Sequence, residues 1–450
     1  MKVFLETYGC QMNEYDSELI RSILTKANYS FVKTESEADV IMLNTCAVRE
    51  NAHRKVYGRI HDIRHDLNGK TPLIGILGCM ATNLRKELLE SRNLKIDFIA
   101  GPDSYKKLPD LIRAAGETGD KPFDLTLSEF ETYSDVYPTR EKGVNAWIAV
   151  MRGCNNFCSF CVVPYTRGRE RSRAPENVLS EVRRLADEGF KQVTLLGQNV
   201  NSYNYEGSDF ADLLDKVSTV KGIERIRFTS PHPKDFPERL LKVVAQNPKV
   251  CKHIHFPLQA GNDRILDMMI RTYTKEEYLG LVDKIRSLCP DVALTTDIIV
   301  GFPTETDSDF QDTVDVVKKV QYDAAFIFKY SVRKNTIAEN KYPDDVPDAI
   351  KAERTVLLND LQKEISLIKN RSYVGQTHSI LIEEERTTRS DEHFQGRTDT
   401  NIIVIIPKGP YKIGDFVDVK ITSATPHVLK GQIFNNQSPN HNNQIISNIQ

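Results

Sequence analysis

The first 115 residues alternate between short apolar runs and amphipathic patterns. Three apolar runs have the length of strands that are buried on both faces: Val3–Tyr8, Val40–Asn44 and Leu73–Leu77. Each is followed by a pattern typical of a helix: Glu14–Ala27, Val48–Asp66 and Asn83–Glu90. Because strands that alternate with helices pair through right-handed crossovers, the sequence predicts an N-terminal parallel α/β, Rossmann-like domain over residues 1–115.

A second α/β pattern follows residues 116–143, whose turn formers and mixed charges are typical of a linker. Six strands are predicted: Trp147–Met151, Gln192–Leu196, Arg225–Phe228, His253–Pro257, Leu294–Val300 and Ala324–Tyr330. Helical patterns lie between them: Pro175–Asp187, Asp209–Val217, Pro237–Ala245, Lys275–Leu288 and Asp307–Lys319. Six β/α repeats predict a (β/α)6 partial barrel with its site at the carboxyl ends of the strands.

The last part of the chain changes pattern again. One long helix over Ala349–Asn370 closes the central domain, which we predict to span 144–371. Short apolar runs separated by glycines predict a small β-barrel over 372–435. The predicted strands are His378–Glu383, Ile402–Ile406 and Phe416–Ile421. Asn, Gln and Ser dominate residues 436–450, for which we expect a disordered tail.

Composition narrows the class of protein. The 450 residues are 27% charged and 40% hydrophobic, an ordinary balance for two to four globular domains. No run of about eighteen apolar residues is present, and the N-terminus lacks the apolar core of a signal peptide, so we expect a cytoplasmic protein with no membrane partner. The net charge of −2 gives no global attraction for nucleic acid, and RNA binding would rest on local patches.

Three of the eight cysteines form a compact motif. Cys154, Cys158 and Cys161 have the spacing C-x3-C-x2-C, directly after a predicted strand. Thiolates this close converge on one soft metal centre. A structural zinc site needs four protein ligands, and no fourth Cys or His is nearby in the sequence. An iron–sulfur cluster that three thiolates hold, with one iron open for a substrate, is therefore favoured over a structural role.

A second triad is separated in sequence. Cys10, Cys46 and Cys79 each follow one of the three predicted strands of the N-terminal domain. The carboxyl ends of neighbouring parallel strands lie at one edge of the sheet, where open α/β sheets bind their ligands. The alternative is three small buried thiols, but their recurrence in successive units favours a second cluster. Cys251 and Cys289 remain and are interpreted as structural.

Five segments resemble the methylthiotransferase family of radical S-adenosylmethionine (SAM) enzymes: Tyr8–Ser17, Asn44–Arg49, Cys154–Arg173, Gly197–Tyr203 and Thr296–Pro303. The likeness covers the chain up to its tail. It is closest to the branch that makes 2-methylthio-N6-dimethylallyladenosine in tRNA (the MiaB type). The resemblance implies a methylthiotransferase domain, a radical SAM core and an RNA-binding TRAM domain, in the order of the three units predicted above. Residues Tyr330–Thr336 depart from the family, which is richer in Pro and Gly there, although Asn335 can adopt the left-handed backbone of a Gly.

The resemblance also implies two 4Fe-4S clusters with different roles. The cluster on Cys154, Cys158 and Cys161 would cleave SAM to a 5′-deoxyadenosyl radical, because a side-chain base cannot activate carbon 2 of adenine. The cluster on the other three cysteines would hold the sulfur to be transferred. The implied substrate is N6-dimethylallyladenosine at position 37 of tRNA, and the implied partners are a low-potential electron donor and a sulfur donor.

Two other functions stay open. Sibling methylthiotransferases act on ribosomal protein S12 or on threonylcarbamoyladenosine in tRNA, but Gln11-Met12-Asn13 after the first cysteine follows the dimethylallyladenosine branch. A two-cluster electron carrier belongs to another class. It would need neither SAM-pocket motifs nor an RNA-type β-barrel, and it would not cleave SAM.

Further site residues are assigned by position. Phe160 is expected to lie against SAM, although core packing explains it equally well. Gln198 and Asn199 follow a barrel strand, where they would hold the amino or carboxylate end of SAM or form a hydrogen-bonded turn. Asp297, inside an apolar strand, is expected to meet a ribose hydroxyl. Gly301 would let the backbone approach the ligand or merely turn the chain.

Four arginines follow the compact cysteine motif: Arg167, Arg169, Arg171 and Arg173. On an extended loop, this alternation would place several guanidiniums on one side, where they suit phosphate or carboxylate. A solvated charged loop is the alternative. Their position just after a catalytic motif favours substrate binding.

Overall fold

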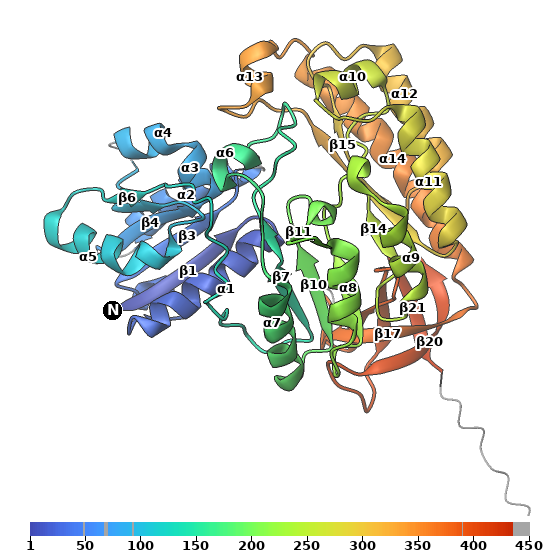
Figure 1. Cartoon of the computed structure of the whole chain (residues 1–450), viewed down its shortest axis with the longest axis horizontal. Helices are drawn as coiled ribbons and strands as arrows, with labels where there is room; N and C mark the ends of the chain where they lie inside the picture. Colours follow the sequence, from blue (N-terminus) through green and yellow to red (C-terminus); the bar gives the residue numbers. More distant parts are fainter. Residues whose placement is uncertain (48–49, 67–70, 92–93, 389, 435–450) are drawn as a thin grey trace, which may run out of the picture. The chain divides into compact units, whose positions relative to one another are not determined.

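The computed structural model describes residues 1–47, 50–66, 71–91, 94–388 and 390–434 (Figure 1). The chain divides into two compact units, Met1–Lys363 and Glu364–Gln450. The first unit contains a parallel sheet and a partial barrel, and the second contains a small closed barrel. The three-part architecture predicted from the sequence is therefore confirmed. No helix in the described ranges has both the length and the apolar character that crossing a bilayer demands.

The N-terminal sheet, blue to cyan in Figure 1, is parallel throughout, with strand order β2-β1-β3-β4-β5-β6. Its strands are β1 (Lys2–Tyr8), β2 (Ser30–Phe31), β3 (Val40–Thr45), β4 (Leu73–Gly78), β5 (Phe98–Ala100) and β6 (Phe123–Asp124). Its helices are α1 (Gln11–Lys26), α2 (Glu50–Asp66), α3 (Cys79–Asn83), α4 (Arg85–Glu90) and α5 (Leu108–Thr118). On β3, Val40 and Met42 join the apolar cluster of α1 and α5, and Ile41 and Leu43 join that of α2. Alternate residues thus bury both faces of the sheet.

Two predicted helices differ from the structure. The helix expected from Val48 begins at Glu50, and Val48 itself lies outside the described residues. The helix expected over Asn83–Glu90 is two helices, α3 and α4, and α3 begins at Cys79. Gly78 makes this early start possible, because its φ of 85° turns the chain directly from β4 into the helix.

Residues 116–143, which the sequence presents as a linker, contain the short strand β6 and the fully buried Tyr133. Strand β6 extends the sheet beside β5. The Tyr133 side chain is fully buried, where its hydroxyl donates to the Pro102 carbonyl at 3.0 Å and accepts from the Tyr105 amide at 3.0 Å. These elements are too short to give a periodic pattern, which is why the sequence did not reveal them.

Six parallel strands form the partial barrel: β7 (Asn145–Ala149), β10 (Gln192–Leu196), β13 (Arg225–Phe228), β14 (His253–His255), β15 (Ala293–Val300) and β16 (Ala324–Lys329). They pair as two three-stranded sheets, β7-β10-β13 and β14-β15-β16. Ile226 of β13 joins the two sheets, since its amide donates to the Lys249 carbonyl and its carbonyl accepts from the Cys251 amide. Among the described strands, β7 and β16 do not pair with each other, so the barrel is open as predicted.

Helices cover the outside of this barrel. The helices predicted between the strands are α7 (Pro175–Asp187), α8 (Phe210–Ser218), α9 (Glu238–Gln246), α11 (Lys275–Leu288) and α12 (Asp307–Val320), and the predicted long helix is α14 (Asp348–Ser372). Three short helices fall in loops: α6 (Val163–Arg167), α10 (Asp263–Met268) and α13 (Ile337–Lys341). Asn335, just before α13, has a φ of 68° and donates to the Asn83 carbonyl at 3.0 Å. The expected left-handed backbone at this position is confirmed.

The second unit, red in Figure 1, is a closed barrel of five strands in the order β17-β18-β19-β21-β20. The strands are β17 (Thr377–Glu384), β18 (His393–Arg397), β19 (Ile403–Pro407), β20 (Phe416–Ala424) and β21 (Val428–Ile433). Ile380, Val404, Val419 and Leu429 fill its interior. The sequence did not predict β18 and β21, because polar residues and glycine interrupt their apolar alternation. The predicted disordered tail lies outside the described residues.

The packing of residues 116–143 predicts a loss of stability in the variant Tyr133→Phe. Removing the hydroxyl leaves the buried Tyr105 amide unpaired and leaves the Pro102 carbonyl with only Arg152 as a donor, so the free energy of unfolding should fall by about 1–3 kcal/mol. Tyr137→Phe is the matched control, because this half-exposed hydroxyl bonds only to Glu188 at the surface, and it should cost below about 0.5 kcal/mol. Urea unfolding measures both values, and equal values for the two variants would contradict the packing.

Candidate iron–sulfur site

The compact cysteine motif lies on a loop whose base is a short antiparallel ladder. Strands β8 (Met151–Arg152) and β9 (Arg171–Ser172) pair on either side of the loop. The Cys154 amide donates to the Gly168 carbonyl at 3.1 Å. Gly153 has a φ of 76°, and a Cβ built on it would lie 2.0 Å from the Arg169 carbonyl oxygen. A glycine is therefore required where the two arms of this cluster loop, residues 153–168, meet.

The three thiols of the cluster loop are buried or half-buried and lie close enough to interact electrostatically. Burial raises the pKa of Cys154 to about 11 and that of Cys161 further, and the neighbouring Cys158 raises both. Each sulfur also accepts a hydrogen bond. The donors are the Asn156 amide to Cys154 at 3.5 Å, Arg271 Nη1 to Cys158 at 3.4 Å and the Val163 amide to Cys161 at 3.5 Å. This donor set suits thiolate ligands, since metal binding deprotonates the thiols.

The second triad lies at one edge of the N-terminal sheet, as predicted. Cys10 follows β1, Cys46 follows β3 and Cys79 follows β4, and these three strands are neighbours. A hydrogen bond from Cys46 lowers the pKa of Cys10 well below its usual value, against the effect of burial and with help from the charge of Arg167. Burial raises the pKa of Cys79, and Arg167 opposes that rise.

The donor chemistry of both triads suits an iron–sulfur cluster. In the described part of the chain, no three His, Cys, Asp or Glu side chains gather closely enough to bind one metal ion. A 4Fe-4S cluster differs, because each thiolate binds its own iron and the sulfurs stand farther apart than the ligands of one ion. Three soft thiol donors that accept hydrogen bonds suit thiolate ligands of iron.

The segments that carry the two triads pack directly on each other. Val162, next to Cys161, forms a small apolar cluster with Cys79 and with Ala47, the neighbour of Cys46. Helix α6 then ends at Arg167, whose Nε donates to the Cys79 sulfur at 3.1 Å. Six cysteines from two domains are thus drawn to one region.

A buried network of ion pairs holds this arrangement. Asp16 on α1 is fully buried, and its two carboxylate oxygens meet Arg152 Nη1 at 2.9 Å and Arg167 Nη2 at 2.8 Å. Arg171 pairs with Asp103 at 3.0 Å. Because an unpaired buried charge is very costly, each of these carboxylates fixes an arginine of the cluster loop or of its base.

The predicted geometry of the four arginines is therefore corrected. Arg167 ends α6, Arg171 lies in β9, and Arg173 is buried against Glu181 at 2.8 Å. Only Arg169 of the four is exposed, with its guanidinium carbon 4.4 Å from the centre of the Phe157 ring. The expectation that all four share one side of an extended loop is wrong, because carboxylates from three different parts of the chain pair with three of them. Their role in substrate binding stays a prediction.

The residues predicted to bind SAM lie at or beside the ends of the barrel strands. Phe160 is half-buried in the cluster loop, and Gln198 is partly exposed after β10. Asn199 is buried, donates to Asp235 at 2.9 Å and accepts from the His232 amide at 3.2 Å, as in the hydrogen-bonded turn considered above. These contacts leave the SAM assignments as predictions.

Asp297 and Gly301 both have protein partners. The side chain of Asp297 on β15 is one-third exposed and meets His255 Nε2 at 3.2 Å, so it is not the lone carboxylate that the sequence implied. The Gly301 amide donates to Glu305 Oε2 at 2.6 Å, and a Cβ on Gly301 would lie 2.3 Å from Lys351 Cγ of α14. Close packing of α14 explains this glycine directly.

The sequence missed three residues that now belong to the site. Arg271 contacts Cys158, Asp16 pairs with Arg167, and His255 pairs with Asp297. Asp16 stood within a recognised motif but carried no signal of its own, and the partners of all three lie 42 to 151 residues away. Only tertiary contact identifies them.

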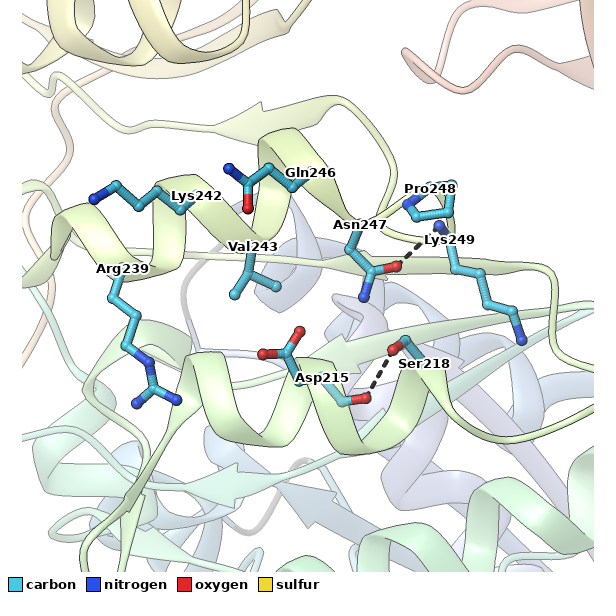
Figure 2. A pocket seen from close by; sticks show the side chains of 9 residues that line it. All are labelled: Asp215, Ser218, Arg239, Lys242, Val243, Gln246, Asn247, Pro248 and Lys249. Carbon is cyan, nitrogen blue, oxygen red and sulfur yellow. Dashed lines mark hydrogen bonds between the residues drawn. The ribbon is translucent and has the colours of Figure 1, made fainter.

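A separate pocket of about 510 Å³ lies between α8 and α9 (Figure 2). Figure 2 shows Asp215 and Ser218 on one helix facing Arg239, Lys242 and Val243 on the other. None of the predicted site residues lines it. None of the cysteines lines this pocket, and we assign it no catalytic role.

Three family profiles match the chain. The Radical SAM superfamily matches residues 148–317, the Uncharacterized protein family UPF0004 matches residues 2–101 and the TRAM domain matches residues 371–434. The first match implies a 4Fe-4S cluster and SAM as cofactors.

Curated relatives match over nearly their whole length. A protein of Chloroherpeton thalassium named tRNA-2-methylthio-N(6)-dimethylallyladenosine synthase is 48% identical over 434 residues, which cover 96% of this chain and 95% of the relative. Proteins with the same name from Phocaeicola vulgatus and Prosthecochloris aestuarii are 45% and 46% identical and cover 96% of this chain and 95% and 98% of their own lengths. Among solved structures, the radical S-adenosylmethionine methyltransferase TsrM from Kitasatospora setae matches with a TM-score of 0.57 at 15% identity, over 75% of this chain and 74% of that one. This last likeness supports the fold alone.

The close backbone contact at Gly153 predicts that the variant Gly153→Ala binds less iron. The new methyl group would collide with the Arg169 backbone and force the loop open, so reconstituted protein should hold about four fewer irons than wild type. Gly189→Ala is the matched control, because Gly189 also has a positive φ, of 94°, but nothing lies within 4 Å of the added Cβ. Iron analysis after anaerobic reconstitution compares the two, and a full iron content in Gly153→Ala would refute the constraint.

Proposed function

Because the chain belongs to the family of tRNA-2-methylthio-N(6)-dimethylallyladenosine synthases, we propose that it attaches a methylthio group to carbon 2 of N6-dimethylallyladenosine at position 37 of tRNA. The observation that carries this proposal is the direct packing of two cysteine triads, through Val162, Cys79 and Ala47. An enzyme that activates one adenine and then adds sulfur to it needs both reagents beside the same substrate atom.

The roles of the two triads follow from their surroundings. A 4Fe-4S cluster on Cys154, Cys158 and Cys161 supplies, when bound, the electron that cleaves SAM to methionine and the 5′-deoxyadenosyl radical. A second 4Fe-4S cluster on Cys10, Cys46 and Cys79 supplies, when bound, the site for the sulfur. The protein contributes hydrogen-bond donors to the sulfurs, above all from Arg271 and Arg167, and apolar packing that excludes water around them.

The remaining partners follow from the balance of the reaction. Cleavage of SAM consumes an electron, so a low-potential electron donor is required. Each product carries away one sulfur atom and one methyl group, so a sulfur donor must restore the second site and a second molecule of SAM must methylate the sulfur. The TRAM unit supports tRNA as the substrate, since it adds a separate barrel to an otherwise complete catalytic unit.

Two alternatives are less well supported. A sibling enzyme acting on ribosomal protein S12 or on threonylcarbamoyladenosine would be expected among the close relatives, yet the relatives described above share one tRNA substrate in their names. A two-cluster electron carrier would not need the match to the radical SAM superfamily or to the TRAM domain. Assays with prenylated tRNA and with the ribosomal protein distinguish the proposed function from the first alternative. Cleavage of SAM distinguishes it from the second.

One anaerobic assay with dithionite, SAM and prenylated tRNA should distinguish the functions of the two triads. The variant in which Cys10, Cys46 and Cys79 are all replaced by Ala should still form 5′-deoxyadenosine but no methylthiolated adenosine, because no sulfur is available. The variant in which Cys154, Cys158 and Cys161 are replaced should form neither product. Chromatography of the nucleosides measures both.

Each outcome of that assay has a clear meaning. Iron analysis provides the control, since each triple variant should retain about four irons per chain if the other cluster is intact. A normal yield of methylthiolated adenosine without the N-terminal cysteines would mean that the sulfur comes from elsewhere. Absence of SAM cleavage in the wild-type chain would instead favour the electron carrier.

The TRAM unit should contribute affinity for tRNA through phosphate contacts. Lys420 and Lys430 are exposed on the paired strands β20 and β21. Replacing both with Ala should weaken tRNA binding and reduce the slope of log affinity against log salt by about one for each lost contact. The variant Lys318→Ala/Lys319→Ala on α12, which removes the same charge, should change neither value. Binding titrations at several salt concentrations test this. Equal losses of affinity in the two variants would show that these lysines of the TRAM unit make no specific contribution to tRNA binding.

A further inference from the structure

We propose that Arg167, an arginine at the end of the first triad's loop, positions Cys79 of the second triad and sets the reduction potential of the cluster bound there. This inference rests on the proposed function, because it assumes that the second triad holds an iron–sulfur cluster. Arg167 thereby acts as a positioning residue rather than as the substrate-binding residue that the sequence suggested.

The three side-chain nitrogens of Arg167 differ in their hydrogen-bond partners. Nη2 pairs with Asp16 at 2.8 Å, and Nε donates to the Cys79 sulfur at 3.1 Å. The third nitrogen, Nη1, is buried and has no hydrogen-bond partner in the described part of the chain. Arg140, Arg152, Arg171 and Arg173 also have such nitrogens, so Nη1 does not distinguish Arg167. The hydrogen bond from Nε to the Cys79 sulfur does.

Asp16 holds Arg167 in this position. Its carboxylate binds Arg167 through one oxygen and Arg152 through the other, and the side chains of all three are at most 2% exposed. The guanidinium is a planar fork, so one end can stay on the carboxylate while Nε faces the sulfur. The ion pair with Asp16 thus holds the cation beside Cys79.

A hydrogen bond and a positive charge at a ligand sulfur shift the reduction potential of a cluster in the same direction. Both stabilise the more negative, reduced state, so they raise the reduction potential. Arg271 stands in the same relation to Cys158 of the first triad, at 3.4 Å. Each triad therefore has one buried arginine that donates to one of its sulfurs.

Arg152 provides a matched control for Arg167. Both guanidiniums are buried, and both bind the same carboxylate. Arg152 also donates to the Pro102 carbonyl at 3.1 Å and forms an ion pair with Asp103 at 3.7 Å. In the described residues, no hydrogen bond joins Arg152 to a cysteine sulfur. A Lys at either position retains a charge for Asp16, but a single Lys nitrogen cannot span both Asp16 and Cys79.

The test uses the full-length chain with Cys154, Cys158 and Cys161 replaced by Ala, so that only the second cluster remains. Redox titration followed by electron paramagnetic resonance measures its midpoint potential. Arg167→Lys should make this potential more negative, and Arg152→Lys should leave it unchanged. In the chain with all six cysteines, Arg167→Lys should lower the yield of methylthiolated adenosine about tenfold while 5′-deoxyadenosine still forms.

A second measurement needs no arginine variant. Pulsed electron paramagnetic resonance of the same cysteine variant, grown with 15N-labelled arginine and reduced, should detect coupling between the cluster and an arginine nitrogen. Its absence would overturn the proposal even if Arg167→Lys fails to fold.

The remaining outcomes separate this inference from the proposed function. An unchanged potential in Arg167→Lys, or an equal shift in Arg152→Lys, refutes the special role of Arg167 and leaves the methylthiotransferase assignment intact. Absence of any cluster on Cys10, Cys46 and Cys79 in the otherwise wild-type chain refutes the proposed function itself.

Discussion

The carboxylate of Asp16 is the constraint on which the candidate site depends. It is fully buried on α1 of the N-terminal domain, and arginines from both ends of the cluster loop neutralise it. Removing one partner from a buried ion pair costs about 3–5 kcal/mol, so the loop cannot leave α1 without a large loss of stability. One charge on one helix therefore ties the radical SAM core to the N-terminal sheet.

This tie determines what the two triads can do together. The cluster loop is rooted in the ladder of β8 and β9, and Val162 within it packs on Cys79 and Ala47. The sheet in turn places its three cysteines at the ends of neighbouring strands. Neither domain alone offers a site where a radical and a sulfur atom meet. The proposed reaction thus requires the interface as much as the cysteines.

Elements with a long regular pattern could be predicted from the sequence. Strands such as Gln192–Leu196 and helices such as Lys275–Leu288 have the predicted bounds, because burial imposes a period of two or 3.6 on their residues. The second triad was also predictable, since parallel topology brings the carboxyl ends of strands to one edge. Spacing rules of this kind need no knowledge of tertiary contacts.

Features that depend on distant partners could not be predicted. Arg167 looked like part of a basic loop, because Asp16 lies 151 residues earlier and nothing local marks the pairing. Asp297 looked like a lone carboxylate because His255 is on another strand. The strands β6, β8 and β9 have only two residues each, too few for any period. In each case the feature is stabilised by a tertiary contact, which no local pattern in the sequence reveals.

The measurement that tests the account most directly is nucleoside analysis of tRNA from cells that lack this protein. The account predicts that 2-methylthio-N6-dimethylallyladenosine disappears and that N6-dimethylallyladenosine accumulates in its place. Restoring the chain on a plasmid should restore the modified nucleoside. Unchanged amounts of the methylthiolated nucleoside in the deletion strain would contradict the account.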